Sequence, residues 1–333
     1  MKTEVFSSST SRQYLHSAFD YVSKPTMDSK LYSGFLLAIE IIILVVRIFI
    51  TIFESIYRLC VPDEEKPVNN EIVLITGTGH GMGRELALQY AELGATVVCV
   101  DINKESNDET VKLVNDIGKK KAHSYQCDVS NEQQVKVLVD KVKQEVGVVS
   151  ILVNNAGIMP CHRFFTYTEA EIQKLFGINV FAHIWLLQNI LPDMIEKNHG
   201  HIITLSSMAG VIGVENLAPY CATKFAVRGM IESLHEEIRT RTKGTNIKFT
   251  LIYPYMVDTG LCQKPVIRFP SILSMVKPKE AARQIIQASR RNILEHSIPS
   301  TLLGTNNFFR LLPHKAGLLL KDFLGSTLDE HDK

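Results

Sequence analysis

The residues best suited to chemistry in this sequence are Tyr220 and Lys224, four positions apart, with Ser207 thirteen positions before the tyrosine. Side chains at i and i+4 share one face of a helix, so the phenol and the ammonium can be neighbours. A tyrosine, with a pKa of about 10, is a poor base at neutral pH, and a nearby positive charge lowers that pKa. We therefore expect Tyr220 to take a proton from an alcohol, with Lys224 tuning it and Ser207 hydrogen-bonding the substrate oxygen.

A glycine-rich turn lies far upstream, reading TGTGHGMG over residues 76–83 directly after an apolar β-branched run at 71–76. An apolar helix face begins at the end of this turn, and the free N–H groups of a helix N-terminus bind phosphate. Gly77 permits the tight turn, Gly81 lets a pyrophosphate approach, and Gly83 lets helix and strand pack closely. We expect a dinucleotide cradle with these members: Gly77, His80, Gly81, Met82 and Gly83.

The choice of dinucleotide depends on Asp101, which ends the next apolar run at 95–100. A carboxylate there accepts hydrogen bonds from the adenosine ribose and repels a 2′-phosphate, which favours NAD over NADP. The alternative is that Asp101 is only a helix cap or turn residue. Asp128 and Val129, after a third strand at 122–126, are expected to flank the adenine.

The apolar runs alternate with helical patterns, which predicts βαβ units and an α/β fold with a doubly wound parallel Rossmann sheet. One long helical stretch at 168–197 contains Asn179. The expected strands lie at 71–76, 95–100, 122–126, 150–153 and 201–205, and the other expected helices lie at 104–117 and 131–146.

Composition narrows the class of protein. The chain is 45% hydrophobic with a formal net charge of +1, which fits a globular core and gives no indication of a nucleic-acid partner. Its six cysteines are scattered without a CxxC pair, so we expect no metal site, no disulfide framework and reduced thiols on the cytosolic side.

The N-terminal region predicts a membrane anchor. Residues 1–30 are polar and expected to be mobile, whereas 31–60 are strongly apolar. Glu40, Arg47 and Glu54 recur every seven residues and fall on one narrow stripe. A bilayer span would place Arg47 near the midplane at a cost of about 2.5–3.5 kcal/mol. The pattern suits a helix lying in one leaflet or a membrane segment facing a partner helix; the third reading is a soluble helix packed on the domain.

Beyond this anchor we expect a linker at 61–70, a catalytic domain at 71–300 and an apolar C-terminal extension at 301–333. The glycine turn, the NNAG at 154–157, Asn179, Ser207 and the YxxxK at 220–224 together resemble the short-chain dehydrogenase/reductase family. Finer features narrow the resemblance to its family 16C: DINK at 101–104, VSILVNNAG at 149–157, HGH at 199–201 and the tail KAGLLLKDFLG at 315–325.

The resemblance implies roles for further residues. Lys224 would also hold the nicotinamide ribose, and Asn179 would order a water that links the lysine to solvent. Ser206 is a rival to Ser207, but the family spacing favours Ser207. Pro254 is followed by a tyrosine where many relatives have glycine. The resemblance implies these cofactor contacts: Asn155, Ala156, Gly157, Tyr220, Lys224, Pro254, Val257 and Thr259.

The resemblance also implies a substrate and a setting. The substrate would be a lipophilic alcohol, foremost retinol oxidised to retinaldehyde with NAD; the alternatives are a hydroxysteroid or other lipid alcohol, or a non-catalytic lipid-droplet protein. Residues 261–275 would form a substrate lid. The apolar stretch at 301–324 either packs on the domain or contacts membrane. We expect a homodimer on endoplasmic reticulum membrane or lipid droplets, with the catalytic domain in the cytosol.

Overall fold

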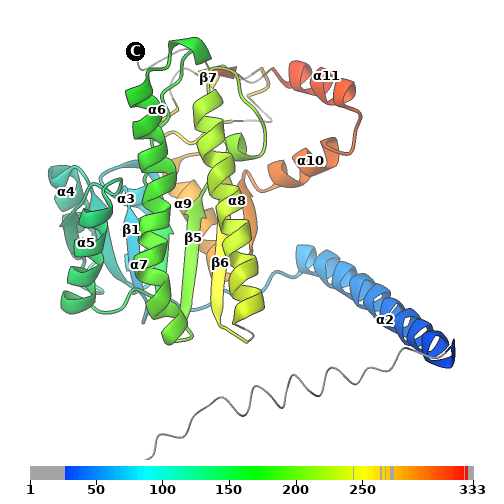
Figure 1. The fold of residues 1–333 in the computed structure, drawn as a ribbon. Coiled ribbons are helices and arrows are strands. Elements are labelled where there is room, and N and C mark those ends of the chain that lie inside the picture. The colour runs from blue at the N-terminus through cyan, green and yellow to red at the C-terminus, as the bar shows by residue number, and fades with distance from the viewer. Residues whose placement is uncertain are drawn as a thin grey trace, which may run out of the picture. The chain divides into compact units, whose positions relative to one another are not determined.

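Seven parallel strands form one sheet within the unit Glu64–Lys333 of this computed structural model (Figure 1). The strand order is β3-β2-β1-β4-β5-β6-β8, which confirms the expected doubly wound parallel sheet. The strands are β1 (Ile72–Thr76), β2 (Thr96–Asp101), β3 (His123–Gln126), β4 (Ile151–Asn154), β5 (Gly200–Leu205), β6 (Ile247–Pro254) and β8 (Glu295–Ile298).

The chain order reverses between β1 and β4, which lie side by side in the middle of the sheet. Ligands of open α/β sheets bind at such a reversal, beyond the carboxyl ends of the strands. This edge of the sheet is where the glycine turn follows β1 and the NNAG segment follows β4.

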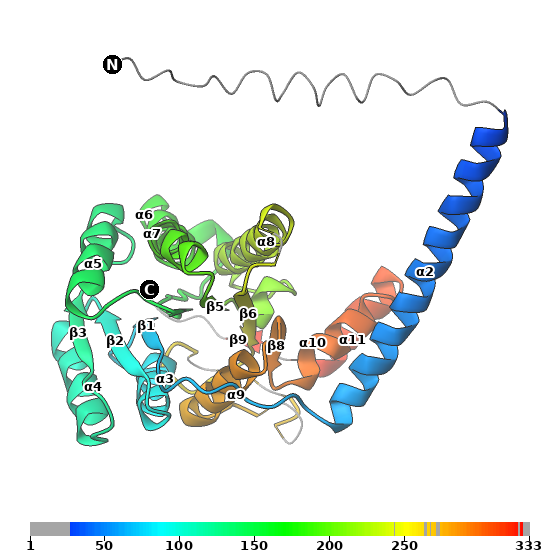
Figure 2. The same ribbon diagram turned by 90° about the horizontal axis from the view of Figure 1, so that it is seen from below.

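Helices cover both faces of the sheet (Figure 2). One face packs against α3, α4 and α9, and the other against α5, α7 and α8, so each face has its own apolar core. Burial on both faces explains why the strands read as continuous apolar runs. The helices are α3 (Gly81–Glu92), α4 (Lys104–Asp116), α5 (Glu132–Glu145), α6 (Glu169–Phe176), α7 (Ala182–Glu196), α8 (Ala218–Arg241) and α9 (Pro278–Arg290).

The helix expected at 168–197 is interrupted. A capping box at Thr168 starts α6, as the side chain of Glu171 returns to the backbone of the cap. A π-helical turn, Gly177–Phe181, then separates α6 from α7 and contains Asn179. Such turns inside helices occur frequently at functional sites. Periodicity alone could not reveal this one, because the apolar pattern continues through it.

The C-terminal region adds two exposed helices, α10 (Thr301–Phe309) and α11 (His314–Leu324). A small antiparallel sheet joins β7 (Pro265–Val266) to β9 (Thr327–Leu328), so the end of the chain pairs with the segment expected to form the lid. The elements α9 and β8 were not anticipated from the sequence. Two short 3₁₀ turns complete the fold, Phe164–Thr166 and Met208–Gly210.

The other unit, up to Asp63, contains the 34-residue helix α2 (Met27–Cys60). Its stretch Ser33–Arg58 is long and apolar enough to cross a membrane and buries none of its side chains within the unit. Arg58 pairs with Glu54 at 3.8 Å, as the i,i+4 spacing predicts. The structure describes residues 27–242, 244–262, 265–266, 268–270, 274–325 and 327–328, so most of the expected mobile segment and parts of the expected lid lie outside the described residues.

Candidate active site

Three of the predicted catalytic residues meet at the carboxyl end of β5. Ser207 follows this strand and caps a 3₁₀ turn, its Oγ accepting a hydrogen bond from the Ala209 amide at 3.1 Å. Tyr220 lies in the first turn of α8, beside Pro219, which a first turn accommodates because its N–H groups have no helical partner. Ser207 and Tyr220 share a side-chain hydrogen bond, and both are buried.

Lys224 lies one turn further along α8, and its side chain is buried between the end of β5, the Tyr220 ring and the NNAG segment. Its Nζ donates to the carbonyl of Leu205 at 3.0 Å and lies 5.7 Å from the centre of the Tyr220 ring. The same Nζ is 3.7 Å from where a Cβ on Gly157 would be. The ammonium therefore lies between the phenol and the NNAG segment, as the i,i+4 spacing suggested.

Burial shifts the pKa values of Lys224 and Tyr220 in opposite directions. Burial lowers the pKa of Lys224 to about 8. Burial also raises the pKa of Tyr220, and the hydrogen bond with Ser207 acts in the opposite direction without overcoming it. Within the protein alone, desolvation of the phenolate thus outweighs the hydrogen bond from Ser207, and the pKa of Tyr220 stays above its ordinary value.

Asn179 lies in the π-helical turn, fully buried behind this pair. Its Oδ1 accepts from the Ile158 amide at 2.9 Å, and its Nδ2 donates to the Ile158 carbonyl at 3.0 Å and to the Thr223 hydroxyl at 3.2 Å. The Asn179 side chain therefore fastens the segment after β4 to α7 and α8. Its Oδ1 also lies 3.2 Å from where a Cβ on Gly157 would be.

The geometry separates the two adjacent serines. The Ser206 hydroxyl donates to the backbone carbonyl of Lys224 at 2.9 Å and so fixes α8 against β5. The Ser207 hydroxyl instead contacts Tyr220 and donates to the Pro254 carbonyl at 3.3 Å. Of the two, only Ser207 has the contact with the phenol that the predicted chemistry requires.

The glycine turn fits a dinucleotide phosphate. Gly77 and Gly81 have φ of +73° and +59°, which side chains rarely adopt. A Cβ on Gly83 would lie 1.9 Å from the Gly77 carbonyl oxygen, so only glycine allows this close approach of helix and strand. A Cβ on Gly81 would lie 3.0 Å from Thr259, which brings that distant residue against the turn.

Asp101 turns its carboxylate towards the same loop. Its two oxygens accept from the Gly79 and Asn103 amides, each at 2.8 Å. The helix α4 is capped by Asn103 instead, whose side chain accepts from the Ser106 amide. The carboxylate therefore lies beside the glycine turn, where it retains lone pairs that can accept from a ribose.

The NNAG segment is tied to the same turn. Asn155 donates from Nδ2 to the Thr76 carbonyl at 2.8 Å, and the amides of Asn155 and Ala156 donate to the Thr76 hydroxyl. The strands β1 and β4 are thereby joined at the crevice between them. Gly157 follows beside Lys224, so the cradle and the catalytic pair are continuous.

The remaining predicted cofactor contacts follow the carboxyl ends of the strands, and their side chains make fewer hydrogen bonds to the glycine turn. Asp128 bonds locally to Ser130, and Val129 is buried in the core. His80 is exposed at the start of α3, and Met82 is half-buried. Pro254 ends β6, and Val257 is buried and bridges to Val276.

Two polar residues that support the cradle were missed from the sequence. Arg84 donates to the Gly79 carbonyl and to the Thr110 hydroxyl, and so clamps the turn to α4. Asn107 is fully buried and donates to the carbonyls of Cys99 and Tyr125, joining β2 to β3. A buried asparagine on an otherwise polar helix gives no periodic signal, whereas an arginine in the first turn after the glycines was a signal that could have been used.

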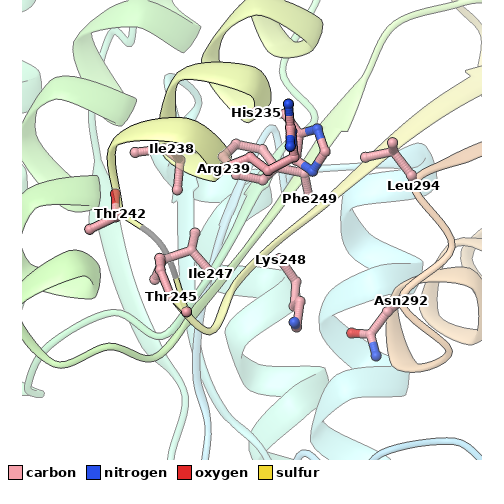
Figure 3. A pocket seen from close by; sticks show the side chains of 11 residues that line it. His235, Ile238, Arg239, Thr242, Thr245, Ile247, Lys248, Phe249, Asn292 and Leu294 are labelled. Atoms are coloured by element: carbon pink, nitrogen blue, oxygen red, sulfur yellow. The ribbon is translucent and has the colours of Figure 1, made fainter. Parts of the chain in front are cut away.

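A pocket of about 260 Å³ lies elsewhere, at the start of β6 and the end of α8 (Figure 3). His235, Arg239 and Lys248 contribute to its lining, and none of its lining residues belongs to the predicted site. Arg239 is paired with Glu236. Among the described residues no cluster of histidine, cysteine or carboxylate side chains could hold a metal ion.

A family model, short chain dehydrogenase, matches residues 71–266, and the chain belongs to this family. It is 41% identical to epidermal retinol dehydrogenase 2 of Mus musculus, over 83% of this chain and 89% of that protein. It is also 41% identical to short-chain dehydrogenase/reductase family 16C member 6 of Bos taurus, over 71% and 74%. The identity to 17-beta-hydroxysteroid dehydrogenase 13 of Homo sapiens is 36%, over 85% and 92%. The resemblance to family 16C is thus confirmed.

Solved structures share the fold. A short-chain dehydrogenase/reductase from Burkholderia phymatum in complex with NAD matches with a TM-score of 0.66 and 23% identity, over 80% of this chain and 98% of that one. A metagenomic short-chain oxidoreductase in complex with NADP matches with a TM-score of 0.58 and 27% identity, over 69% and 96%. This chain is therefore an oxidoreductase of a nicotinamide-dinucleotide fold, and its neighbours include complexes with both dinucleotides.

Proposed function

We propose that this protein is a membrane-associated, NAD-dependent dehydrogenase of a lipophilic alcohol, foremost all-trans-retinol, which it oxidises to retinaldehyde. One arrangement carries the proposal. The Lys224 ammonium lies 5.7 Å from the Tyr220 ring and next to Gly157, so a phenol, a cation and a dinucleotide motif adjoin one another. Alcohol oxidation needs these three together, because a proton and a hydride leave the substrate in one reaction.

In the proposed reaction Ser207 holds the substrate oxygen and Tyr220 accepts its proton. When bound, the nicotinamide accepts the hydride and brings a positive charge beside the phenol. Lys224 adds a second positive charge, whose proton is readily exchanged because burial lowers its pKa to about 8. These charges would oppose the desolvation that raises the pKa of Tyr220. The backbone of Gly77 to Gly83 would hold the pyrophosphate, and Asn179 would order a water beside Lys224.

NAD is the proposed cofactor because Asp101 is directed at the glycine turn. Its carboxylate is 2.8 Å from the Gly79 amide and would repel a 2′-phosphate there. Arg84 lies nearby, but its guanidinium is engaged by the Gly79 carbonyl, Thr110 and Glu109.

An apolar substrate is favoured by the segments beyond the catalytic residues. The Arg268 guanidinium lies 5.3 Å from the ring centres of both Phe269 and Phe323, and so joins α11 to the proposed lid. Lys321 of α11 donates to the Gly213 carbonyl at 2.8 Å, in the loop after Ser207. Helices α10 and α11 and the turn between them expose a group of large apolar side chains: Phe308, Leu311, Leu318, Leu319 and Phe323.

These exposed side chains and helix α2 support attachment to a membrane, for which we propose the endoplasmic reticulum or lipid droplets. The six cysteines form no disulfide in the described part of the chain, which agrees with a catalytic domain on the cytosolic side. Phe181 on the π-helical turn and Phe225 on α8 are 45% and 40% exposed, which supports a homodimer formed through these helices. A hydroxysteroid is the second candidate substrate, supported by the relative named 17-beta-hydroxysteroid dehydrogenase 13.

The test uses membranes that contain the full-length protein, incubated with retinol, estradiol or a fatty alcohol and with NAD⁺ or NADP⁺. We expect retinol with NAD⁺ to be turned over fastest. Tyr220→Phe should lower the turnover about a thousandfold, in the range that general-base catalysis contributes, while NAD binding is kept.

The matched control is Tyr125→Phe. Tyr125 lies on the edge strand β3, and the change removes its hydroxyl, which donates a hydrogen bond to Glu145 of α5. We expect this variant to keep wild-type turnover. Full activity in Tyr220→Phe would refute the proposed base, preference for estradiol would select the second candidate, and absence of any turnover would favour a non-catalytic lipid-droplet protein.

A further inference from the structure

A buried histidine adjoins the proposed site. His183 lies on α7, four residues after Asn179, and is 2% exposed. Burial and the charge of Lys224 lower the pKa of His183 to about 3, so its ring is neutral at any working pH. Its Nδ1 is buried and has no hydrogen-bond partner among the described residues.

Two further side chains, on strands β4 and β5, also have buried polar atoms without a hydrogen-bond partner among the described residues. Asn154 ends β4 and Thr204 lies in β5, where the two are direct partners in the parallel register. Leu152 and Ile202, two residues earlier in each strand, pack in the core with α7, so Asn154 and Thr204 face that helix too. Both atoms of the Asn154 amide and the Thr204 hydroxyl are buried without a partner in the described part of the chain.

The position of Lys224 connects the three residues. Its Nζ donates to the carbonyl of Leu205, the residue directly after Thr204, and lies near Gly157, three residues after Asn154. It also acts electrostatically on His183. The ammonium therefore lies where the ends of β4 and β5 meet the start of α7.

Four buried polar atoms of these residues lack a protein partner among the described residues: His183 Nδ1, both atoms of the Asn154 amide and the Thr204 hydroxyl. Leaving one of them without a hydrogen bond costs about 1–3 kcal/mol, so four in one place would consume much of the stability of a domain. Buried polar groups that lack protein partners are commonly satisfied by ordered water, which makes two to four hydrogen bonds. A neutral imidazole and an amide can both donate and accept, as such a water requires.

We propose that His183, Asn154 and Thr204 form a site for ordered water beside the Lys224 ammonium, and that this water exchanges protons with Lys224 during turnover. The proposal rests on the proposed dehydrogenase function. The alcohol proton is transferred to the Tyr220 phenolate. The Lys224 ammonium gives one proton to the water, and the resulting amine takes up the proton that the Tyr220 phenol releases, so both groups return to their starting states and one proton leaves the site. The reverse transfer accompanies reduction. Asn179, whose side chain is saturated by Ile158 and Thr223, is then not the sole polar support behind the lysine.

The charged groups around this site are few. Among the described residues, Lys224 of α8 is the charged group that acts on His183, and the facing strands β4 and β5 contribute the uncharged Asn154 and Thr204. His183 is thus a positioning residue that stays neutral, and the group that changes its protonation is Lys224. Removing the water would desolvate the ammonium further and lower the pKa of Lys224. The phenol would then lose a positive neighbour, so the rise of the oxidation rate with pH would move to higher pH.

Three variants of the full-length protein test this. His183→Leu keeps the volume of the side chain but removes its polar atoms, and His183→Asn keeps a polar atom near the position of Nδ1. His201→Leu is the matched control, a buried histidine whose Nε2 bonds Thr250 and which contacts neither Lys224 nor the catalytic residues in the described structure. Steady-state alcohol oxidation is measured across pH in ordinary and heavy water.

We expect His183→Leu to lower kcat about tenfold with little change in KM, and to shift the pH profile upward by about half a unit or more. Its solvent isotope effect should increase. His183→Asn should restore the wild-type profile, and His201→Leu should not change it. An unchanged profile in His183→Leu, or the same shift in all three variants, would overturn the proposal, since either result indicates a structural role alone.

A crystal structure at a resolution that shows ordered water provides a second reading independent of activity. We expect water within hydrogen-bond distance of His183 Nδ1 and of the Asn154 amide. A dry space, or a His183 ring bonded directly to a protein group, would contradict the site. If the wild-type protein oxidised no alcohol, the proposed function would fail, whereas the water site would still be decided by this electron density.

Discussion

The cofactor half and the substrate half of the site are built differently. Around Gly79 in the cofactor half, hydrogen bonds span short stretches of chain: Gly79 bonds Asp101 over 22 residues, and Arg84 bonds Thr110 over 26. In the substrate half, Lys321 bonds Gly213 over 108 residues. The glycine turn, Arg84 and Asp101 thus belong to a single βαβα unit that runs from β1 to α4, whereas the substrate half is assembled from a loop, a lid and a C-terminal helix.

The two constructions indicate which part of the site can vary. The glycine turn tolerates little change, since a Cβ at Gly83 would clash with the backbone and Gly77 and Gly81 have φ values that side chains rarely adopt. The contacts of α11 are few and lie at the surface, where changes have small effects on stability. A family that keeps one coenzyme and changes its substrates would be expected to keep the first half and vary the second.

Gly83→Ala should have the largest effect on stability and on NAD binding. A small effect would mean that the cofactor half is no more tightly packed than the substrate half. The added Cβ would lie 1.9 Å from the Gly77 carbonyl oxygen, so α3 must move away from β1. We expect a loss of about 3 kcal/mol or more in the free energy of unfolding and no measurable NAD binding. Chemical denaturation and calorimetric titration with NAD⁺ measure both.

The control is Gly229→Ala on the exposed side of α8, where an added Cβ would meet nothing within 4 Å. Alanine favours a helix by about 1 kcal/mol over glycine, so this variant should be slightly more stable than the wild type. Equal behaviour of the two variants would mean that the cradle is not tightly packed.

The sequence predicted the cofactor half well for the same physical reason. The strand, turn and helix between Ile72 and Asp101 are local and carry their own signals, namely apolar runs and glycines at positions that need them. The neighbourhood of Tyr220 and Lys224 also follows from helical spacing. In contrast, the π-helical turn around Asn179 and the pairing of β7 with β9 depend on tertiary contacts, which periodicity does not record. The burial that raises the pKa of Tyr220 also cannot be read from spacing.

Asp101→Asn sharpens the comparison within the cofactor half. The amide oxygen can still accept from the Gly79 amide, but the negative charge is lost, so repulsion of a 2′-phosphate disappears. We expect the ratio of kcat/KM with NAD⁺ to that with NADP⁺ to fall about tenfold or more, in line with about 1.5–3 kcal/mol for a charged hydrogen bond.

Asp116→Asn, at the exposed end of α4, makes the same charge change away from the turn and should leave this ratio unaltered. A wild-type protein that already preferred NADP⁺, or an Asp101→Asn variant with the wild-type ratio, would contradict the assigned role of the carboxylate.

The smallest effect is expected in the substrate half, from Arg268→Ala. This change removes the guanidinium between Phe269 and Phe323 and its hydrogen bond to the Phe323 carbonyl, so α11 is held less firmly over the lid. Exposed cation–π contacts are worth about 0.5–1 kcal/mol, which corresponds to about a two- to fivefold rise in KM for a lipophilic alcohol. The KM for NAD⁺ and the turnover at saturation should stay at their wild-type values, since no cofactor contact is touched.

Arg310→Ala, at the exposed end of α10, removes an equal charge and should change neither constant. If Arg268→Ala instead weakened NAD binding, the two halves would be coupled and the comparison would fail; if it changed no constant, α11 would have no part in substrate binding.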